Sequence, residues 1–286
     1  MGAQYTALPR CIVADEVQDF SENELRLLPL LVDQHETDNL FLVGDGAQKI
    51  YQRGFSLRNA GIDVTGRSKI LRKKYRNTRQ VIEAAHQLIA NYDCDDLDAE
   101  NVGKPETPDY PAREGKLPRL IRFSQEDTEA DWITSEIKAL VESGVVAPGE
   151  IVVLGGSPRM REKIMTLLAE KGIESCELRE DVAIDSVRVK VSTIESAKGH
   201  ESPSVFVAGL VEGIIPWHNV DEDGERLHAS RLYVAMTRAR DELTMTCSTA
   251  GENGQAQSPS RYLSAIQNKC EEFAFKSGRL VPLPSA

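Results

Sequence analysis

Short apolar runs alternate along the chain with stretches in which apolar residues recur at helical spacing. Runs of β-branched and aliphatic residues predict strands, because a strand covered on both faces is apolar throughout. The predicted strands are Cys11–Ala14, Leu40–Val43, Arg119–Phe123, Ile151–Leu154, Val187–Thr193, Val205–Gly209 and Leu243–Cys247. The alternation predicts an α/β fold with a parallel sheet and helices on both faces.

Helix boundary signals agree with this alternation. Residues that can cap a first helical turn stand before apolar stripes of helical period, and glycines stand after two of them. The predicted helices begin after Asn77 or Thr78, run through Ile133–Val141 to Gly144, and run from Ser157-Pro158 to Gly172. All are expected to pack against the sheet.

Glycines between residues 54 and 66 separate the first two predicted strands from the rest of the chain. The sequence therefore predicts a small first domain over residues 1–56 and a larger α/β domain over residues 57–250, without a large accessory insertion. Residues 251–286 are mostly polar, with a short helical stretch at Arg261–Cys270, and are expected to form a mobile C-terminal tail.

The net charge of −11 and the pI near 5.1 oppose binding to polyanions, so any nucleic-acid contact has to rely on local basic patches. The 5 cysteines are scattered and include no C-x-x-C pair, which argues against a disulfide framework and a zinc site and favours a reducing cytoplasm. No apolar run approaches the roughly 20 residues of a membrane span, so no membrane association is expected.

The first candidate functional residues follow the ends of the first two predicted strands. Asp15-Glu16 follows the first strand, where one carboxylate could hold Mg²⁺ and the other could orient or deprotonate a water. The second strand ends in Gly-Asp and is followed by Gln48 and Tyr51. Each segment alone would also fit an ordinary turn. A Walker A loop, G-x-x-x-x-G-K-[ST], does not occur in these 286 residues.

Three later segments carry functional groups as well. Leu71–Thr78 is basic and contains Tyr75-Arg76, although a solvated positive face before a helix would look the same. Val191–Glu201 leaves a strand and turns through small residues. Arg231–Arg240 is typical of an apolar helix with several arginines, and burying one of them without an acceptor would be costly.

These segments, in this order, resemble motifs II to VI of the UvrD/Rep/PcrA-like branch of superfamily one helicases. The matching patterns are D-E-x-Q-D, G-D-x-x-Q-x-I-Y, Y-R-x-T, A-K-G-x-E and Y-V-A-M-T-R-A-R, between about residue 11 and residue 247. In that family two RecA-like domains hold ATP between them and move 3′ to 5′ along single-stranded DNA. The resemblance implies a second RecA-like domain, an incomplete remnant of the first, and ATP and Mg²⁺ as ligands.

Carried over to this sequence, the resemblance implies that Asp15 holds Mg²⁺ and that Glu16 is the general base. Gln48 would contact the γ-phosphate, and Arg76 and Arg238 would be the two arginine fingers. The adenosine would be bound by Tyr75, Gly199 and Glu201. The implied DNA-binding residues are Tyr51, Thr193 and Ser196, with Arg53 or Phe55 in place of a tryptophan that the family usually has.

The sequence departs from the family pattern in several places. Glu195 stands where motif V commonly has a histidine, and a carboxylate there would repel DNA phosphates. Because the phosphate loop is absent from this sequence, residues 1–56 are expected to be a poorly stable remnant with exposed apolar edges. Trp217, after an E-G-x-x-P turn, is expected to anchor a loop rather than to stack on a base.

The leading hypothesis is the carboxy-terminal part of an ATP-dependent 3′–5′ DNA helicase or translocase that acts on single-stranded DNA or a 3′-tailed duplex. The missing N-terminal RecA-like domain would be supplied in cis or by a partner chain, and this chain alone would not hydrolyse ATP. The alternative is a non-catalytic DNA- or protein-binding module. The retained Asp15, Glu16, Gln48, Arg76 and Arg238 favour the first hypothesis, while DNA and RNA both stay open as substrates.

Overall fold

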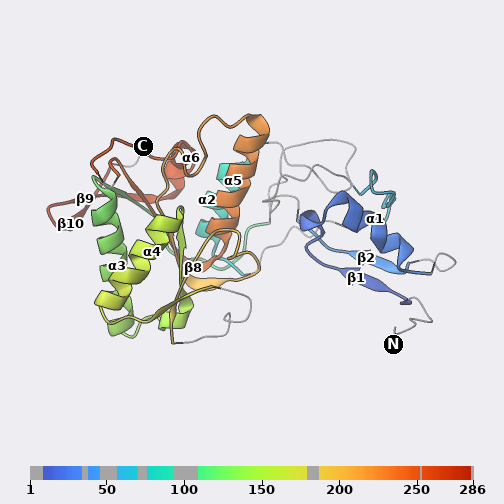
Figure 1. The fold of residues 1–286 in the computed structure, drawn as a ribbon, viewed down its shortest axis with the longest axis horizontal. Coiled ribbons are helices and arrows are strands. Elements are labelled where there is room, and N and C mark those ends of the chain that lie inside the picture. The colour runs from blue at the N-terminus through green and yellow to red at the C-terminus, as the bar shows by residue number, and fades with distance from the viewer. Residues whose placement is uncertain are drawn as a thin grey trace. The chain divides into compact units, whose positions relative to one another are not determined.

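A computed structural model describes residues 9–33, 38–45, 57–69, 76–92, 109–178, 187–251 and 253–284 (Figure 1). The chain divides into two compact units. The smaller comprises residues 1–71 and 92–105, and the larger comprises residues 72–91 and 106–286. None of the described helices combines the length and the apolar composition that a membrane span requires.

The larger unit is built on an eight-stranded sheet, in the order β10-β9-β3-β8-β7-β4-β6-β5. All neighbouring strands are parallel except β10, which runs antiparallel to β9. The strands are β3 (Arg119–Phe123), β4 (Ile151–Gly155), β5 (Ser175–Glu177), β6 (Val189–Ser192), β7 (Ser202–Ala208), β8 (Ala239–Ser248), β9 (Glu271–Lys276) and β10 (Arg279–Pro282). The predicted α/β fold with a mostly parallel sheet is confirmed.

Helices cover both faces of this sheet (Figure 1). One face carries α3 (Glu126–Glu142) and α4 (Pro158–Glu170), and the other carries α2 (Arg79–Ile89), α5 (Glu222–Thr237) and the short α6 (Tyr262–Ile266). Short 3₁₀ turns at Pro148–Glu150 and Gln267–Lys269 lead into β4 and β9. The two helical layers explain why the central strands are apolar on both faces.

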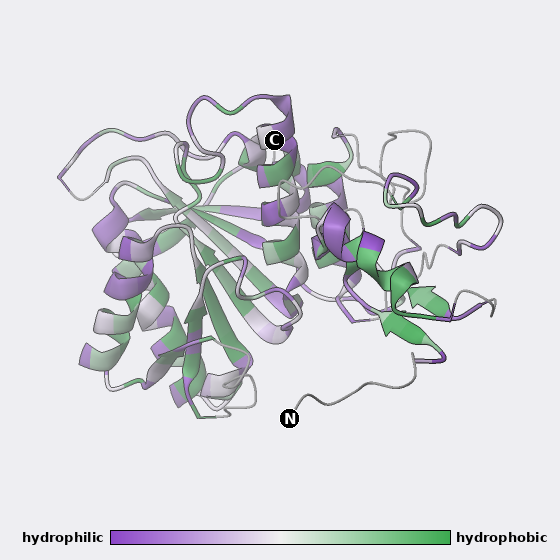
Figure 2. Ribbon diagram, turned by 45° about the vertical axis from the view of Figure 1, so that its right-hand side comes forward, coloured by the Kyte–Doolittle hydropathy of each residue, from purple (hydrophilic) through white to green (hydrophobic). Residues whose placement is uncertain are grey.

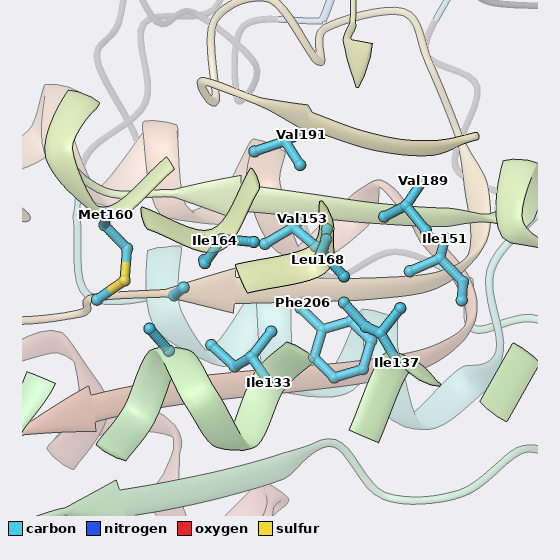
Figure 3. Packing of buried hydrophobic residues seen from close by; sticks show 12 residues of the cluster. Ile133, Ile137, Ile151, Val153, Met160, Ile164, Leu168, Val189, Val191 and Phe206 are labelled. Carbon is cyan, nitrogen blue, oxygen red and sulfur yellow. The ribbon is translucent and has the colours of Figure 1, made fainter. Parts of the chain in front are cut away.

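The core under α3 and α4 shows how the apolar stripes predicted from the sequence meet the sheet (Figure 3). Ile133 and Ile137 of α3 and Ile164 and Leu168 of α4 are completely buried, and they pack with Phe206 of β7. Fully burying side chains of this size contributes roughly 1.5–3 kcal/mol each. The helical spacing of these residues therefore places α3 and α4 on one face of the sheet.

The helix ends follow the capping residues in the sequence. Ser157 caps α4, because its hydroxyl accepts a hydrogen bond from the backbone N–H of Met160 at 3.1 Å. Thr78, rather than Asn77, is the N-cap residue of α2. Gly144 and Gly172 follow α3 and α4 with positive φ angles of 69° and 76°, a conformation that glycine adopts at little cost.

The expectation of a mobile tail at residues 251–286 is wrong for the described part of this segment. α6 packs against α2, β9 pairs with β3 in parallel, and β10 forms the edge of the main sheet. Phe275 of β9 contacts Phe123 of β3, with ring centroids 5.4 Å apart. The polar composition misled the prediction, because β9 and β10 bury their side chains only partly and so lack an apolar run.

The smaller unit contains a two-stranded parallel sheet of β1 (Ile12–Ala14) and β2 (Leu40–Leu42), with α1 (Glu22–Leu30) and a 3₁₀ turn at Val17–Asp19. Sequence reasoning missed α1, although Ser21-x-x-Glu24 is a capping-box signature. In the structure the Ser21 N–H donates to the Glu24 carboxylate at 2.6 Å. Pro29 near the end of α1 hid the helical pattern.

The core of the smaller unit extends beyond the boundary that the glycines suggest. Leu57, Ala60 and Ile62 are buried against Ala14 and Leu25. These contacts attach residues 57–62 to the smaller unit, so the predicted boundary at residue 56 is wrong. Gly61 and Gly66 lie in local turns, with φ angles of 83° and 72°.

A buried carboxylate links α3 to the centre of the main sheet. Glu129 is completely buried, and its Oε1 accepts hydrogen bonds from the backbone N–H of Gly209 at 2.8 Å and from the hydroxyl of Thr246. Burial raises the pKa of Glu129, although both hydrogen bonds oppose that shift. The folded protein therefore holds a proton on Glu129 more tightly than the unfolded chain does.

We expect the contribution of Glu129 to the free energy of unfolding to decrease as the pH rises above about 4.5, the ordinary glutamate value. The pKa is higher in the folded state, so stability is greatest below the unfolded pKa and is lost as the pH rises through the folded one. Glu129→Gln removes this titration. Urea denaturation of both proteins between about pH 5 and about pH 8 measures the effect.

The matched control is Glu142→Gln, which replaces an exposed carboxylate at the end of the same helix. The wild type and this control are expected to lose more stability with rising pH than Glu129→Gln does. Identical pH dependence of all three proteins would contradict the assignment.

Candidate functional site

Asp15 and Glu16 lie at the carboxyl end of β1 and are exposed. This end of a parallel sheet is where open α/β folds bind ligands. Glu16 has a φ of 53°, in the left-handed region that non-glycine residues adopt infrequently. Its backbone N–H donates to Asp15 Oδ1 at 2.8 Å, so the Asp15 carboxylate is held against the backbone of this turn.

Gln18 connects this turn to the end of the neighbouring strand. Its side chain is almost completely buried, its Nε2 donates to a carboxylate oxygen of Glu16, and its Oε1 accepts from the backbone N–H of Asp45 at 3.0 Å. The backbone N–H of Val17 also donates to Val43 at 3.0 Å. Gln18 is therefore a positioning residue that sequence reasoning missed, although the D-E-x-Q-D pattern contained it.

The donor set at this turn fits Mg²⁺. A small hard cation prefers carboxylate oxygens and usually keeps several waters, so it needs only one or two protein carboxylates. Among the described residues no group of three or more His, Cys, Asp or Glu side chains forms a complete metal cage. The exposed carboxylate of Asp15 is suited to this open kind of site.

Several predicted site residues lie outside the described residues, namely Gln48, Tyr51, Arg53, Phe55 and Tyr75. Their roles stay predictions from the sequence.

In the larger unit, Arg76 and Glu201 come together from positions far apart in the sequence. Arg76 donates from Nη1 to Glu201 Oε1 at 3.0 Å, and the Arg76 side chain is 77% exposed. An ion pair this exposed contributes little to stability. It holds one predicted arginine finger next to the predicted ribose-binding carboxylate.

Asn77 and Ser202 fix this pair to the predicted second finger. The buried side-chain amide of Asn77 donates to the backbone carbonyls of Thr237 and Ala239, at 2.8 and 2.7 Å, on either side of Arg238. The backbone N–H of Ser202 donates to the carbonyl of Arg238 at 2.9 Å. Sequence reasoning considered Asn77 only as a helix cap and therefore missed this role.

Arg238 is buried, with 5% of its surface exposed, and is folded back onto the end of α5. Its Nε donates to the carbonyl of Val234 at 3.1 Å, where the helix dipole favours a positive charge. The predicted helix over Arg231–Arg240 ends at Thr237, and β8 begins at Ala239. The helix stops there because Ala239 pairs with Ser202 of β7 and so enters the sheet.

The predicted DNA-binding turn of motif V follows β6. The hydroxyl of Thr193 accepts a hydrogen bond from the backbone N–H of Ser196 at 3.1 Å, and the two hydroxyl oxygens are 3.2 Å apart. The turn ends at Gly199, which has a φ of 79°. It thus carries two hydroxyl side chains in the turn that leads to Glu201.

Glu195, the unusual residue of this turn, is paired with Arg231 of α5. The distance between Arg231 Nη2 and Glu195 Oε1 is 2.5 Å, and neither side chain is more than 30% exposed. The carboxylate therefore carries its own counter-charge. Because Arg231 balances its charge, Glu195 would repel a nearby DNA phosphate less than an unpaired carboxylate would.

Comparison with protein families gives matches to both parts of the chain. The family model described as the UvrD-like helicase C-terminal domain matches residues 153–250, and that of the UvrD/REP helicase N-terminal domain matches residues 2–66. The two matches fall in the larger and the smaller unit, respectively.

Curated relatives are also helicases. A probable DNA helicase of Mycoplasma pneumoniae is 25% identical over 93% of this chain and 48% of its own length. DNA helicase II of Escherichia coli is 33% identical over 38% of this chain and 16% of its own length, and Rep of Buchnera aphidicola is 39% identical over 35% and 15%. The chain thus spans about half the length of the first relative and less of the others.

Among solved structures, the C-terminal domain of a possible DNA helicase from Lactobacillus plantarum WCFS1 is similar, with a TM-score of 0.46 and 20% identity over 68% of this chain and 94% of that one. The two family matches and the curated relatives together give the assignment. The chain is a homologue of the UvrD/Rep DNA helicases and contains sequence of both the N-terminal and the C-terminal domain of that family.

Proposed function

We propose that this chain is part of an ATP-dependent DNA translocase or helicase that couples ATP hydrolysis to 3′–5′ movement on single-stranded DNA. The observation that carries the proposal is the assembly around Arg76, in which Glu201 binds its guanidinium and Asn77 holds the backbone on both sides of Arg238. This arrangement ties the segment that carries Arg76 to the backbone that carries Arg238, which is what two arginines acting on one phosphate group would need.

In this proposal Asp15 holds Mg²⁺, which would neutralise charge on the phosphates, and Glu16 accepts the proton of the attacking water. The hydrogen bond from Gln18 orients the Glu16 carboxylate for that task.

Arg76 exchanges its contact with Glu201 for a phosphate oxygen, which frees Glu201 for the ribose hydroxyls. Arg238 likewise exchanges the carbonyl of Val234 for the phosphate. Gln48 senses the γ-phosphate, and Tyr75 and Gly199 complete the nucleotide site.

The motif V turn serves the nucleic acid in this proposal. The hydroxyls of Thr193 and Ser196 are suited to donating to phosphate oxygens, as hydroxyl side chains commonly do in protein–DNA contacts. Bases of the strand would stack on side chains that follow the second strand of the sequence, namely Tyr51, Arg53 and Phe55.

We also propose the cytoplasm as the compartment, because the scattered cysteines favour a reducing environment.

An exposed apolar surface supports the view that further polypeptide completes the smaller unit. Val13 and Phe41 are neighbours in the register of β1 and β2, and they are 69% and 61% exposed. Both strands consist of hydrophobic residues, as their green colour in Figure 2 shows. The opposite face of the same strands is covered by the core around Leu25. Because parallel strands are normally covered on both faces, we propose that a segment carrying the phosphate loop, in cis or from a partner chain, packs here.

We expect no DNA-stimulated ATP hydrolysis from this 286-residue chain alone, because no Walker A sequence is present to bind the β- and γ-phosphates. Phosphate release with saturating single-stranded DNA measures the rate, and Glu16→Gln provides the background. Robust hydrolysis that Glu16→Gln abolishes would contradict the requirement for a phosphate loop from outside these 286 residues while supporting the assignment of Glu16.

Binding of single-stranded DNA is expected to weaken steeply with salt and to depend on Lys73 and Lys74 in the basic segment before α2. Replacing both with Gln should flatten the plot of log affinity against log salt by about 0.7 for each phosphate that the lysines no longer neutralise. Fluorescence anisotropy with a labelled oligonucleotide gives both slopes.

The control, Lys276→Gln with Arg279→Gln, removes the same charge from exposed positions of β9 and β10. It should leave the slope unchanged. Equal slopes in all three proteins, or an affinity independent of salt, would refute the role of the basic segment.

A further inference from the structure

The segment that leads into β3 crosses the start of α2, next to the predicted arginine fingers. The backbone N–H of Arg79, in the first turn of α2, donates to the carbonyl of Arg113 at 2.8 Å. We call residues 113–115 the strap. Because an N–H group in the first turn of a helix has no acceptor within that helix, the strap supplies one. The strap is thus bound to α2 shortly after Arg76 in the sequence.

The strap also fits closely against the cap of α2. The backbone N–H of Gly115 donates to Gln80 Oε1 at 2.8 Å, and Gln80 Nε2 donates to the carboxylate of Glu114 at 2.7 Å. A Cβ atom at Gly115 would lie 2.5 Å from Cγ2 of Thr78, so glycine is the residue that allows this approach. These contacts fix the backbone of the strap on the first turn of α2.

From this fixed backbone the side chain of Arg113 reaches acceptors on two other segments. Its Nη1 donates to the carbonyl of Arg76 at 3.2 Å and to the carbonyl of Arg240 at 3.3 Å, and its Nη2 donates to the carboxylate of Asp241. The planar guanidinium presents its donors in a rigid fork, so one side chain can hold these acceptors in a set arrangement. Arg113 therefore joins the backbone of the first predicted finger to β8, directly after the second, Arg238.

The acceptors on β8 lie in a β-bulge. Arg240 and Asp241 together stand opposite the single residue Pro203 of β7. Proline has no N–H to donate to a ladder, and the carbonyl of Arg240 accepts from the backbone N–H of Thr78 at 3.0 Å as well as from Arg113. Bulges beside active sites commonly re-aim the groups of a strand. Here the bulge connects the start of β8 to the start of α2.

Stability alone is a weak explanation for this arrangement. The side chains of Arg113 and Asp241 are 45% and 31% exposed, and exposed ion pairs contribute little to the free energy of unfolding. Holding a long side chain in one conformation also costs entropy. A functional explanation is that the backbone of Arg76 is fixed before a ligand arrives, because that lowers the cost of ordering it on binding.

We propose that Arg113 is a positioning residue that fixes the backbone of Arg76 relative to that of Arg238, so that both predicted fingers reach the terminal phosphates of one nucleotide. Arg113 acts through Arg76 and does not itself contact the nucleotide. The proposal rests on the proposed function, because it requires Arg76 to bind a phosphate of ATP. It adds a residue outside the motifs that the sequence resemblance supplied.

Binding of ATP and of AMP to the 286-residue chain separates recognition of the terminal phosphates from recognition of the nucleoside. AMP shares the adenosine but lacks the β- and γ-phosphates. Millimolar dissociation constants are expected, because no Walker A sequence is present, and chemical-shift titration by NMR covers that range. Omitting Mg²⁺ leaves the cationic side chains to bind the phosphates. The readout is the ratio of the two dissociation constants, which is the preference for ATP.

Arg76→Ala sets the scale for the variants. It is expected to reduce the preference for ATP by about 10-fold or more, the loss for one charge-assisted hydrogen bond. Arg113→Lys keeps the positive charge but not the planar fork, and a loss of about 5-fold to 10-fold is expected with the affinity for AMP unchanged. Combining the two substitutions should add nothing to the loss in Arg76→Ala, because Arg113 acts through Arg76.

The matched control is Lys116→Gln, which removes an exposed ion pair with Glu242 from the residue after the strap. It should leave the preference for ATP unchanged. Thermal unfolding of each variant checks that the fold is intact. If Arg113→Lys fails to fold, Asp241→Ala decides by the same ratio, since it removes one of the acceptors of Arg113 and leaves the two carbonyls. A smaller loss in the same direction is then expected.

The outcomes separate the two proposals. An undiminished preference for ATP in folded Arg113→Lys, or in folded Asp241→Ala where that variant decides, would overturn the positioning role and leave the proposed function standing. A further loss in the double variant would do the same, because it would mean that Arg113 binds the phosphates itself. A wild-type chain that binds ATP no more tightly than AMP would remove the phosphate-binding role of Arg76 and overturn both.

Discussion

Parallel strands need cover on both faces, and this requirement shapes both units of the chain. In the larger unit α3 and α4 cover one face and α2 and α5 the other, so Phe206 and Val153 in the central strands are completely buried. In the smaller unit the described core packs against one face of β1 and β2, and Val13 and Phe41 on the other face are exposed. The larger unit thus meets this requirement, whereas the smaller unit presents apolar residues that call for further cover.

A second consequence of parallel strands is that their carboxyl ends share one edge, where loops from distant sequence positions meet. β1 delivers Asp15 and Glu16 in this way, and Gln18 ties their turn to the end of β2. Around Arg76, at the amino ends of β7 and β8, a side chain aligns the segments instead, because the amide of Asn77 reaches the backbone carbonyls on either side of the second predicted finger. Backbone carbonyls are precise acceptors, so a single amide aligns two segments about 160 residues apart in sequence.

The arginines at the candidate sites of this acidic chain are each bound to an acceptor within the protein. Glu201 holds Arg76, Glu195 holds Arg231, and the guanidinium of Arg238 rests on a backbone carbonyl at the end of α5. The predicted catalytic arginines are thus already bound to acceptors that a phosphate would have to replace.

The sequence by itself determined the fold class and singled out the candidate site residues, because hydrophobic period, helix caps and motif identity are local. Every predicted strand is present, although the half-buried β9 resembled a polar tail. Only the tertiary structure decided how those residues are used. The ion pair of Glu195, the burial of Arg238 and the clamp made by Asn77 each depend on a partner far away in the chain, and no local pattern encodes that partner. The exposure of Trp217 is of the same kind, because its ring meets His228 and Arg231 of α5 and yet stays 55% exposed, whereas the sequence predicted a loop anchor.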